Sequence, residues 1–265
     1  MSTWNELNKF DRDRFAGSNA LIFSPPWSTE QIDWWRENIF KPHGLYPEDL
    51  GEKLSASATG PKTITLSEMN PKTNSFVIRV KGLPSETGEA WYHQRRLNLK
   101  GRLFAAEKMV VPLDAQRKGT GRFLMADLVD TAVMMGLKRI SLEAEDVGRY
   151  AWARFGFVPD ETAWKYHVRI AGRRRLLRSQ SEIAPRRFAA YHDVFDKENP
   201  TLIRTVARWT DQVDSVREFD HNGNPAKIAI GKAVLLESPA NWIGNFELDD
   251  PETMDIFNRY VGRTK

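Results

Sequence analysis

The sequence contains no cysteine in its 265 residues. This absence excludes disulfide bonds, thiolate zinc sites and a cysteine nucleophile, and it fits a reducing compartment. No uninterrupted apolar run approaches the roughly 18 residues that a membrane span requires. The first 21 residues carry six charged side chains where a signal peptide would need an apolar stretch. We therefore expect a cytoplasmic protein with no membrane contact.

A strong charge of one sign is also absent, because 39 basic residues nearly balance 35 acidic ones and leave a net charge of +4. Nucleic-acid binding therefore does not follow from the total charge. The exception is the segment 169–187, which holds seven arginines and a single acid, Glu182. A solvated helix face is the commoner explanation of such a cluster, and binding to phosphates is the alternative.

Metal-binding patterns are missing as well. The five histidines, at positions 43, 93, 167, 192 and 221, lack the spacing of a metal-binding pair, such as two histidines four residues apart. The sequence therefore predicts no metal site.

The chain divides into four predicted segments, and its 41% hydrophobic content is enough to bury a full core. Residues 1–60 form a helical segment and 61–171 a core of strands and helices. A helical insertion follows over 172–225, and 226–265 supply one or more strands and a helix that complete the sheet.

Local signals within these segments predict individual elements. In the first segment, Ser28 and Gln31 form a capping-box pattern that starts a helix running to Pro42, and another helical candidate precedes Ser24-Pro25-Pro26. Runs that alternate in hydrophobicity, separated by turn residues, then predict an antiparallel meander. Its strands are expected over 63–66, 76–80, 89–99 and 103–111.

Two helices with glycine caps are predicted after the meander. Residues 121–135 place apolar side chains on one stripe, and Gly136 stands where a helix C-terminal glycine belongs. A short strand over 139–144 follows, and a helix over 147–155 ends at Gly156. Beyond these, the sequence predicts a strand over 164–170, helical structure over 185–219, a strand over 228–236 and a last helix from Pro251 to Tyr260.

A glycine-containing loop stands between the fourth strand and the first of these helices. It reads Gln116-Arg117-Lys118-Gly119-Thr120-Gly121. Glycines permit backbone torsions that side chains forbid, and exposed N–H groups at a helix start can hold a pyrophosphate. The loop lacks the Gly-Lys-Ser/Thr ending of a Walker loop and the three glycines of a dinucleotide fingerprint. A tight turn without a ligand would have the same glycine pair.

This loop, the strand Glu107 to Val111 and the later run Tyr150 to Phe157 together resemble the GNAT acetyltransferase superfamily. The resemblance extends over residues 74–170 and is tightest from 103 to 158. It implies an α/β (α+β) fold with a mixed, mostly antiparallel central sheet, splayed central strands, helices on both faces and a helical insertion after the core.

The resemblance also implies a cofactor, acetyl-CoA or another acyl-CoA. The backbone N–H groups of residues 117–122 would hold its pyrophosphate, and the pantetheine arm would run along the end of the preceding strand. The residues implied at this site are Met109, Val110, Val111, Gln116, Arg117, Lys118, Gly119, Thr120, Gly121 and Arg122.

The catalytic groups match the family less closely. The family usually has a tyrosine four residues before the glycine of the Gly-Phe pair, and this position is Trp152, which cannot donate an acidic proton. Tyr150 is nearby, although two residues along a helix correspond to about 200° of rotation. Glu145 stands where the family often has an asparagine.

A general base is sought among Glu107, Glu143 and His93. Glu107 is preferred because it lies on the strand that enters the loop, provided that the strand alternation places it on the right face. A structural role is as consistent with each of these residues as a catalytic one, and an amine of low pKa would need no base.

The predicted function is transfer of an acetyl group from acetyl-CoA to an amine by direct attack. The acceptor could be a small molecule or a protein, and the insertion could serve as a substrate lid or as a homodimer surface. The alternative is a GNAT-like binding module without chemistry that binds nucleic acid or an acidic partner through the 169–187 arginines. An enzyme acting on aminoacyl-tRNA would combine the two.

Overall fold

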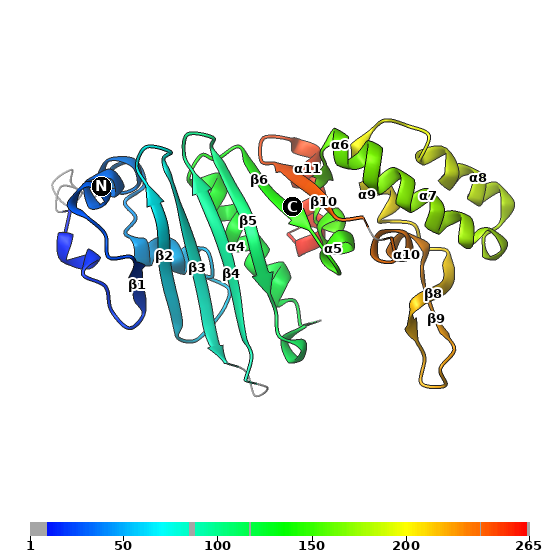
Figure 1. Cartoon of the computed structure of the whole chain (residues 1–265), viewed down its shortest axis with the longest axis horizontal. Coiled ribbons are helices and arrows are strands. Elements are labelled where there is room, and N and C mark those ends of the chain that lie inside the picture. Colours follow the sequence, from blue (N-terminus) through cyan, green and yellow to red (C-terminus); the bar gives the residue numbers. More distant parts are fainter. Residues whose placement is uncertain (1–9, 85–87, 117, 239, 264–265) are drawn as a thin grey trace. The chain divides into compact units, whose positions relative to one another are not determined.

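The computed structural model describes residues 10–84, 88–116, 118–238 and 240–263 (Figure 1). It divides into a first unit, which ends at Ile140, and a second unit, which begins at Ser141. The division falls inside strand β6 (Arg139–Ala144). Among the described residues, no helix is long and apolar enough to cross a membrane.

The first unit contains a mixed sheet in which the strands follow chain order. β1 runs parallel to β2, and the pairs β2–β3, β3–β4 and β4–β5 are antiparallel. The predicted meander is therefore confirmed, whereas β1 was not expected in the N-terminal segment. The strands are β1 (Leu21–Ser24), β2 (Lys62–Asn70), β3 (Ser75–Pro84), β4 (Ala90–Asn98) and β5 (Leu103–Val110).

Helices of the first unit precede and follow this meander. They are η1 (Arg12–Phe15), α1 (Thr29–Trp35), η2 (Arg36–Phe40), α2 (Lys41–His43), α3 (Pro47–Lys53), η3 (Leu113–Ala115) and α4 (Thr120–Met134). The capping box is confirmed, because the Gln31 N–H donates to Ser28 Oγ and the Ser28 N–H to Gln31 Oε1. The helix continues past Pro42 and ends at Gly44, which adopts a φ of +69°. The helical candidate before Ser24 is only the four-residue turn η1.

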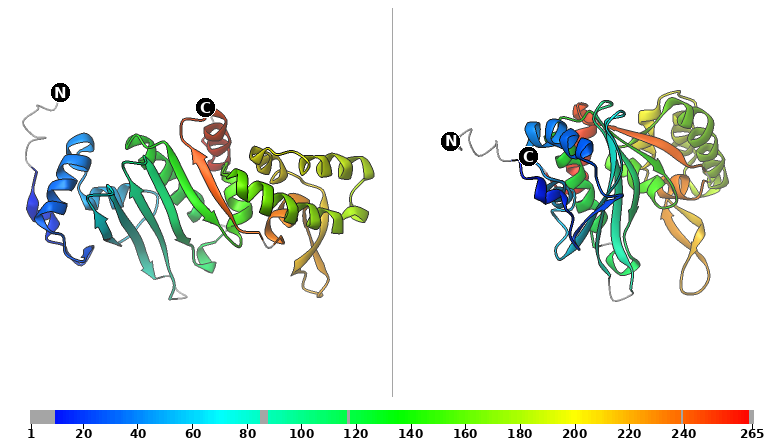
Figure 2. Two further views of the ribbon diagram at one scale, coloured as in Figure 1. Left: turned by 45° about the horizontal axis from the view of Figure 1, so that its top comes forward. Right: turned by 60° about the vertical axis from the view of Figure 1, so that its left-hand side comes forward.

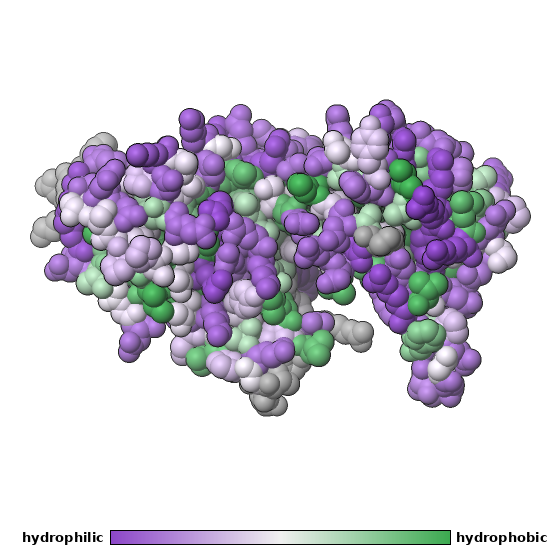
Figure 3. Space-filling model, viewed as in Figure 1, coloured by the Kyte–Doolittle hydropathy of each residue, from purple (hydrophilic) through white to green (hydrophobic). Residues whose placement is uncertain are grey.

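One face of this sheet forms the core of the first unit. Trp35 of α1 lies 5.1 Å from the Phe76 ring, and α3 approaches so closely that a Cβ on Gly51 would stand 2.5 Å from Ile64. Figures 1 and 2 show α3 and α4 on the same side of the strands. The opposite face is polar, and Figure 3 shows hydrophilic side chains over β3 and β4. Helices on both faces, as predicted, are therefore not seen among the described residues of this unit. Buried apolar residues of these strands include Ile64, Leu66, Phe76, Ile78, Val80, Leu97 and Phe104.

α4 has the predicted apolar stripe and glycine cap. Leu124, Leu128 and Ala132 are buried against the unit. Gly136 adopts a φ of +64°, and the Leu137 N–H donates to the Ala132 carbonyl at 2.9 Å. This bond is the one that a left-handed glycine allows at a helix end.

The second unit has a small sheet, a separate hairpin and several helices. The sheet order is β6, β10, β7, and β8 pairs with β9 in the hairpin. The predicted cap at Gly156 is confirmed by its φ of +104°. The strands after β6 are β7 (Val158–Pro159), β8 (Gln212–Phe219), β9 (Pro225–Ala229) and β10 (Trp242–Glu247). The helices are α5 (Gly148–Phe155), α6 (Glu161–Ala163), η4 (Trp164–Val168), α7 (Arg169–Arg178), η5 (Gln180–Glu182), α8 (Pro185–Val194), η6 (Pro200–Leu202), α9 (Ile203–Val206), α10 (Ile230–Leu236) and α11 (Pro251–Val261).

Three predicted elements of the second unit are wrong. Residues 164–170 are helical, because Trp164 and Val168 are buried at a spacing of four residues. The helical prediction for 185–219 fails over β8, where the burial of Val213 and Ser215 alternates as in a strand. In the predicted strand over 228–236, only the first two residues are extended, as the end of β9, and the rest form the helix α10.

Candidate functional site

The loop that follows β5 leads directly into α4 and has one glycine in the left-handed conformation. Gly119 is the N-cap of α4 with a φ of +87°, in the left-handed region that other residues rarely adopt. Gly121 has no such torsion, so the expectation of two special glycines is right only for Gly119. A Cβ on Gly121 would lie 3.5 Å from Met109 Cε and 3.7 Å from Val111 Cγ2. A side chain at position 121 would therefore meet the end of β5 at ordinary contact distance, without a clash.

The start of α4 has backbone donors without an acceptor inside the helix. Its first helical hydrogen bond runs from the Phe123 N–H to the Gly119 carbonyl at 3.0 Å. The N–H groups of Thr120, Gly121 and Arg122 precede this bond and have no acceptor within the helix. Because α4 is 15 residues long, its dipole adds positive potential at the same end. The first turn of α4 is thus suited to an anion.

The side chains of the loop fall into two groups. Gln116 Nε2 donates to the Val111 carbonyl at 3.0 Å and Thr120 Oγ1 to the Ala115 carbonyl at 3.4 Å, so both hold the loop to its surroundings. Lys118 and Arg122 are exposed, and neither makes an ion pair with a described residue. These two charges are available to a ligand. Arg117, the third predicted base, lies outside the described residues.

β5 contains a bulge just before the loop. Gln94 pairs with Lys108 and Arg95 with Ala106, so Glu107 is the extra residue of β5. Beyond the bulge, Met109 pairs with His93 on the face covered by helices, and Val110 pairs with Tyr92. Met109, Val110 and Val111 are half-buried.

Glu107 lies on the polar face of the sheet in a network of charged side chains. Its carboxylate accepts from Arg96 Nε at 2.7 Å and from Gln94 Nε2 at 2.8 Å. Arg96 also donates to Glu68 at 2.6 Å, and the bonds to Glu68 and Glu107 raise the pKa of Arg96. This arrangement matches the structural interpretation of Glu107 at least as well as the catalytic one.

His93 and Arg95 are buried under the bulge on the opposite face, each 1% exposed. Burial, together with the nearby charge of Arg95, holds the pKa of His93 well below its usual range. Arg95 Nη1 donates to the carbonyls of Gln94 at 3.3 Å and Lys108 at 3.1 Å. With no carboxylate bonded to it among the described residues, burial lowers the pKa of Arg95 to about 9.

The sequence did not predict a special role for Arg95. In a strand of alternating polarity, no sequence pattern distinguishes a buried arginine from an exposed one. The bulge explains it physically, since disruption of the strand ladder leaves carbonyls that need a donor. Arg95 donates one hydrogen bond here to the Gln94 carbonyl of β4 and one to the Lys108 carbonyl of β5, next to Glu107. His93, a predicted base, is sealed from solvent in the same layer.

The other predicted catalytic residues belong to the second unit. Glu143 is exposed on β6. The Tyr150 hydroxyl accepts a hydrogen bond from Arg154 Nη1 at 3.0 Å. Trp152 packs 5.6 Å from the ring of Phe157, on another side of α5. Glu145, the residue in the asparagine position, accepts from Asn241 at 3.4 Å. The loop and Glu107 therefore lie in one unit, and Glu143 and Tyr150 in the other.

The arginine cluster of 169–187 is largely neutralised by acidic partners. The partners are Glu198 for Arg169, Asp196 for Arg173, Glu237 for Arg175 and Asp211 for Arg187. Arg174, Arg178 and Arg186 are exposed and have no ion pair among the described residues. The charge left for a nucleic acid is therefore about half of what the sequence suggests.

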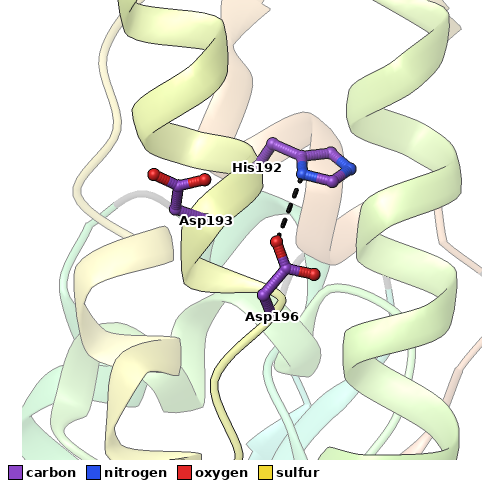
Figure 4. A group of neighbouring side chains, drawn as sticks. All are labelled: His192, Asp193 and Asp196. Carbon is purple, nitrogen blue, oxygen red and sulfur yellow. Dashed lines mark ion pairs between the residues drawn. The ribbon is translucent and has the colours of Figure 1, made fainter.

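A group of potential metal ligands lies at the end of α8. The ligand atoms of His192, Asp193 and Asp196 are within 4.8 Å of one another, and Figure 4 shows His192 facing Asp196. His192 Nδ1 is 3.5 Å from Asp196, which also binds Arg173. Because Arg173 already supplies a positive charge to Asp196, the closeness of these side chains does not require a metal ion.

Comparison with known proteins adds little. No family model matches the chain, and no curated protein is similar enough to identify a relative. A crystal structure of nourseothricin acetyltransferase aligns with 34% of this chain at 20% sequence identity, with a TM-score of 0.28. The alignment spans 53% of that protein's chain. A TM-score this low does not establish a shared fold.

Proposed function

We propose that the chain is an acyl-CoA-dependent N-acyltransferase that transfers an acetyl group to an amine by direct attack. The observation that carries the proposal is the start of α4, where Gly119 turns the chain and three backbone N–H groups precede the helical ladder. Lys118 and Arg122 add two unpaired positive charges at the same place. Together they form a setting for a pyrophosphate.

The resemblance to the GNAT superfamily favours acyl-CoA over other pyrophosphate ligands. It would run the pantetheine arm past Met109, Val110 and Val111, which follow the bulge directly. Bulges are frequent beside active sites because they redirect backbone groups. In the proposed site, Arg95 keeps the backbone at this bulge fixed from below.

The chemical step requires an amine nitrogen, a thioester carbonyl and two proton transfers. The amine attacks the carbonyl carbon, the C–N bond forms, the C–S bond breaks, and the amine loses a proton. Thiols have a pKa of about 8.5, so a CoA thiolate can leave and take a proton from solvent near neutral pH. Trp152 in place of the usual tyrosine is therefore compatible with turnover. Glu107 and Glu143 remain the proposed bases and Tyr150 the proposed acid.

Calorimetric titration with acetyl-CoA tests the cofactor site. Gly119→Glu places a carboxylate at the anion site and should weaken binding by at least about tenfold, or 1.4 kcal/mol. Gly60→Glu is the matched control, because Gly60 also has a positive φ, of +94°, but stands in open space. Equal affinities of the two variants, or no heat with the unmodified chain, would refute the site.

Turnover is tested by release of free thiol from acetyl-CoA with a set of small amines and basic peptides. Release that depends on the amine supports the transferase. Saturable binding of acetyl-CoA without release for any amine would support the binding module. The pairing of Arg169, Arg173, Arg175 and Arg187 speaks against nucleic acid as the partner of such a module.

A further inference from the structure

The second unit contains a hollow of about 480 Å³ whose lining includes none of the residues proposed above for cofactor binding or catalysis. It is lined by Arg154 of α5, Arg208 just after α9, and Ile256, Arg259 and Tyr260 of α11. None of these described lining residues is acidic. A concave surface with three guanidinium groups is unusual unless something negative binds there.

The positive charges of this hollow are poorly compensated. Arg154 donates to the Tyr150 hydroxyl and stands 5.4 Å from the centre of the Tyr260 ring, so two aromatic residues hold it. Arg208 is exposed, and neither it nor Arg154 has an ion pair with a described carboxylate. Arg259 alone has one, to Asp255 at 2.7 Å. The lining arginines and Asp255 together carry a formal charge of +2.

Buried contacts hold the three contributing elements in place. The Phe155 ring of α5 lies 4.8 Å from the ring of Tyr260 in α11. Arg204 of α9 is buried and donates to the Gly156 carbonyl at 2.8 Å and to Thr253 Oγ1 at 2.5 Å. Burial lowers the pKa of Arg204, and the charge of Arg208 acts in the same direction. The backbone elements that carry the hollow are thus held by buried contacts, and Arg208 and Arg259 are exposed side chains on them.

We infer that this hollow binds a phosphate-bearing small molecule, with the phosphate on Arg154, Arg208 and Arg259. A phosphate group carries a charge of about −1.5 to −2 near pH 7 and has several acceptor oxygens, which matches three guanidinium groups better than a carboxylate does. Ile256 and Tyr260 offer an apolar and aromatic surface to the rest of the ligand. The lining residues all belong to the second unit, whereas the loop at Gly119 belongs to the first.

The inference is tested with inorganic pyrophosphate by calorimetry. Because the loop at Gly119 could also bind pyrophosphate, the titrations use the Gly119→Glu background, which removes that site. Arg208→Gln is the probe, since Arg208 is exposed and its loss should leave the fold intact. Arg174→Gln removes the same charge from an exposed arginine of α7 and is the matched control.

We expect Arg208→Gln to weaken pyrophosphate binding about tenfold and Arg174→Gln to leave it unchanged. Equal losses in both variants would indicate diffuse attraction to a positive surface and overturn the inference, as would the absence of saturable heat. Tighter binding of citrate than of pyrophosphate would overturn the choice of phosphate. The single variant Arg208→Gln, with Gly119 intact, should bind acetyl-CoA as the unmodified chain does. A loss of acetyl-CoA affinity in this variant would show that the hollow belongs to the cofactor site and would overturn the inference of a second site. Failure of acetyl-CoA to bind the unmodified chain would refute the transferase and leave this inference standing.

Discussion

The ion pair between Arg175 and Glu237 offers a sharp test of how the second unit is held together. Arg175 Nε donates to Glu237 Oε2 at 2.6 Å, and their side chains are only 3% and 2% exposed. Glu237 also accepts from the Val216 N–H at 2.8 Å and from the Ser215 hydroxyl. Arg175 donates further to Ser179 Oγ and to the Asp214 carbonyl. The pair therefore joins α7, the end of α10 and β8, with its principal polar atoms satisfied.

Glu237→Gln keeps the side-chain shape but removes the charge opposite Arg175. Removal of one partner of a buried pair costs about 3–5 kcal/mol, because the other charge stays buried without compensation. For a unit of this size, such a loss lowers the thermal transition by about 10–20 °C. Glu198→Gln is the control, since Glu198 is exposed and its pair with the half-buried Arg169 should contribute less than about 1 kcal/mol.

Hydrogen exchange measured by mass spectrometry assigns the effect to the unit concerned. Peptides from β8 and α7 should lose protection in Glu237→Gln, while peptides from β3 and β4 of the first unit should not. The double variant Arg175→Met with Glu237→Leu should recover part of the loss, because apolar replacement of both partners removes the buried charge. A loss below about 1 kcal/mol in Glu237→Gln would refute the reasoning.

Three further variants test other parts of the structure. The pKa of His93 is lowered on folding, so below about pH 6.5 the unfolded chain binds a proton that the folded chain does not. The free energy of unfolding should therefore fall by up to about 1.4 kcal/mol for each pH unit below this value. Urea titrations of His93→Leu should lack this pH dependence. Gly231→Ala places a Cβ 2.2 Å from the Val206 carbonyl and should cost about 1–3 kcal/mol in urea unfolding, whereas Gly101→Ala, with 3.4 Å to its nearest neighbour, should cost less. Glu107→Gln should change the free energy of unfolding by less than about 1 kcal/mol, so its turnover can be measured on folded protein. Turnover slowed by about two orders of magnitude or more would identify Glu107 as the base, and unchanged turnover would identify it as structural.

Elements with a local chemical signal were predictable from sequence. The capping box at Ser28 and the glycine caps at Gly136 and Gly156 depend on residues within one turn of the helix end, so the sequence contains the whole cause. The meander was equally readable because its turns and alternation are local. These features account for the predicted β5, loop and α4 of the candidate site.

Elements decided by distant contacts were not predictable in this way. The apolar run Ile228 to Leu236 suits a strand or a buried helix, and what distinguishes them is the approach of Gly231 to the Val206 backbone. Similarly, residues 164–170 alternate in polarity, yet Trp164 is held as part of a helix by its ring contact with Phe195. Tertiary contacts of this kind override a local period.

The position of Glu107 shows why the loop at Gly119 is easier to predict from the sequence than the face on which a strand residue lies. A pyrophosphate loop requires a turn, a helix start and nearby positive charges, all within residues 116–122. The face on which Glu107 lies depends instead on one extra residue in β5. No residue type in this strand indicates the bulge. The bulge is stabilised by Arg95, whose donors reach the carbonyls of Gln94 and Lys108 across the strand pair. Because side-chain direction changes with each residue of register, an unseen bulge reverses any assignment made by counting along the strand. A base in this chain must therefore be identified by the pH dependence of turnover in variants, and not by its distance in sequence from the loop.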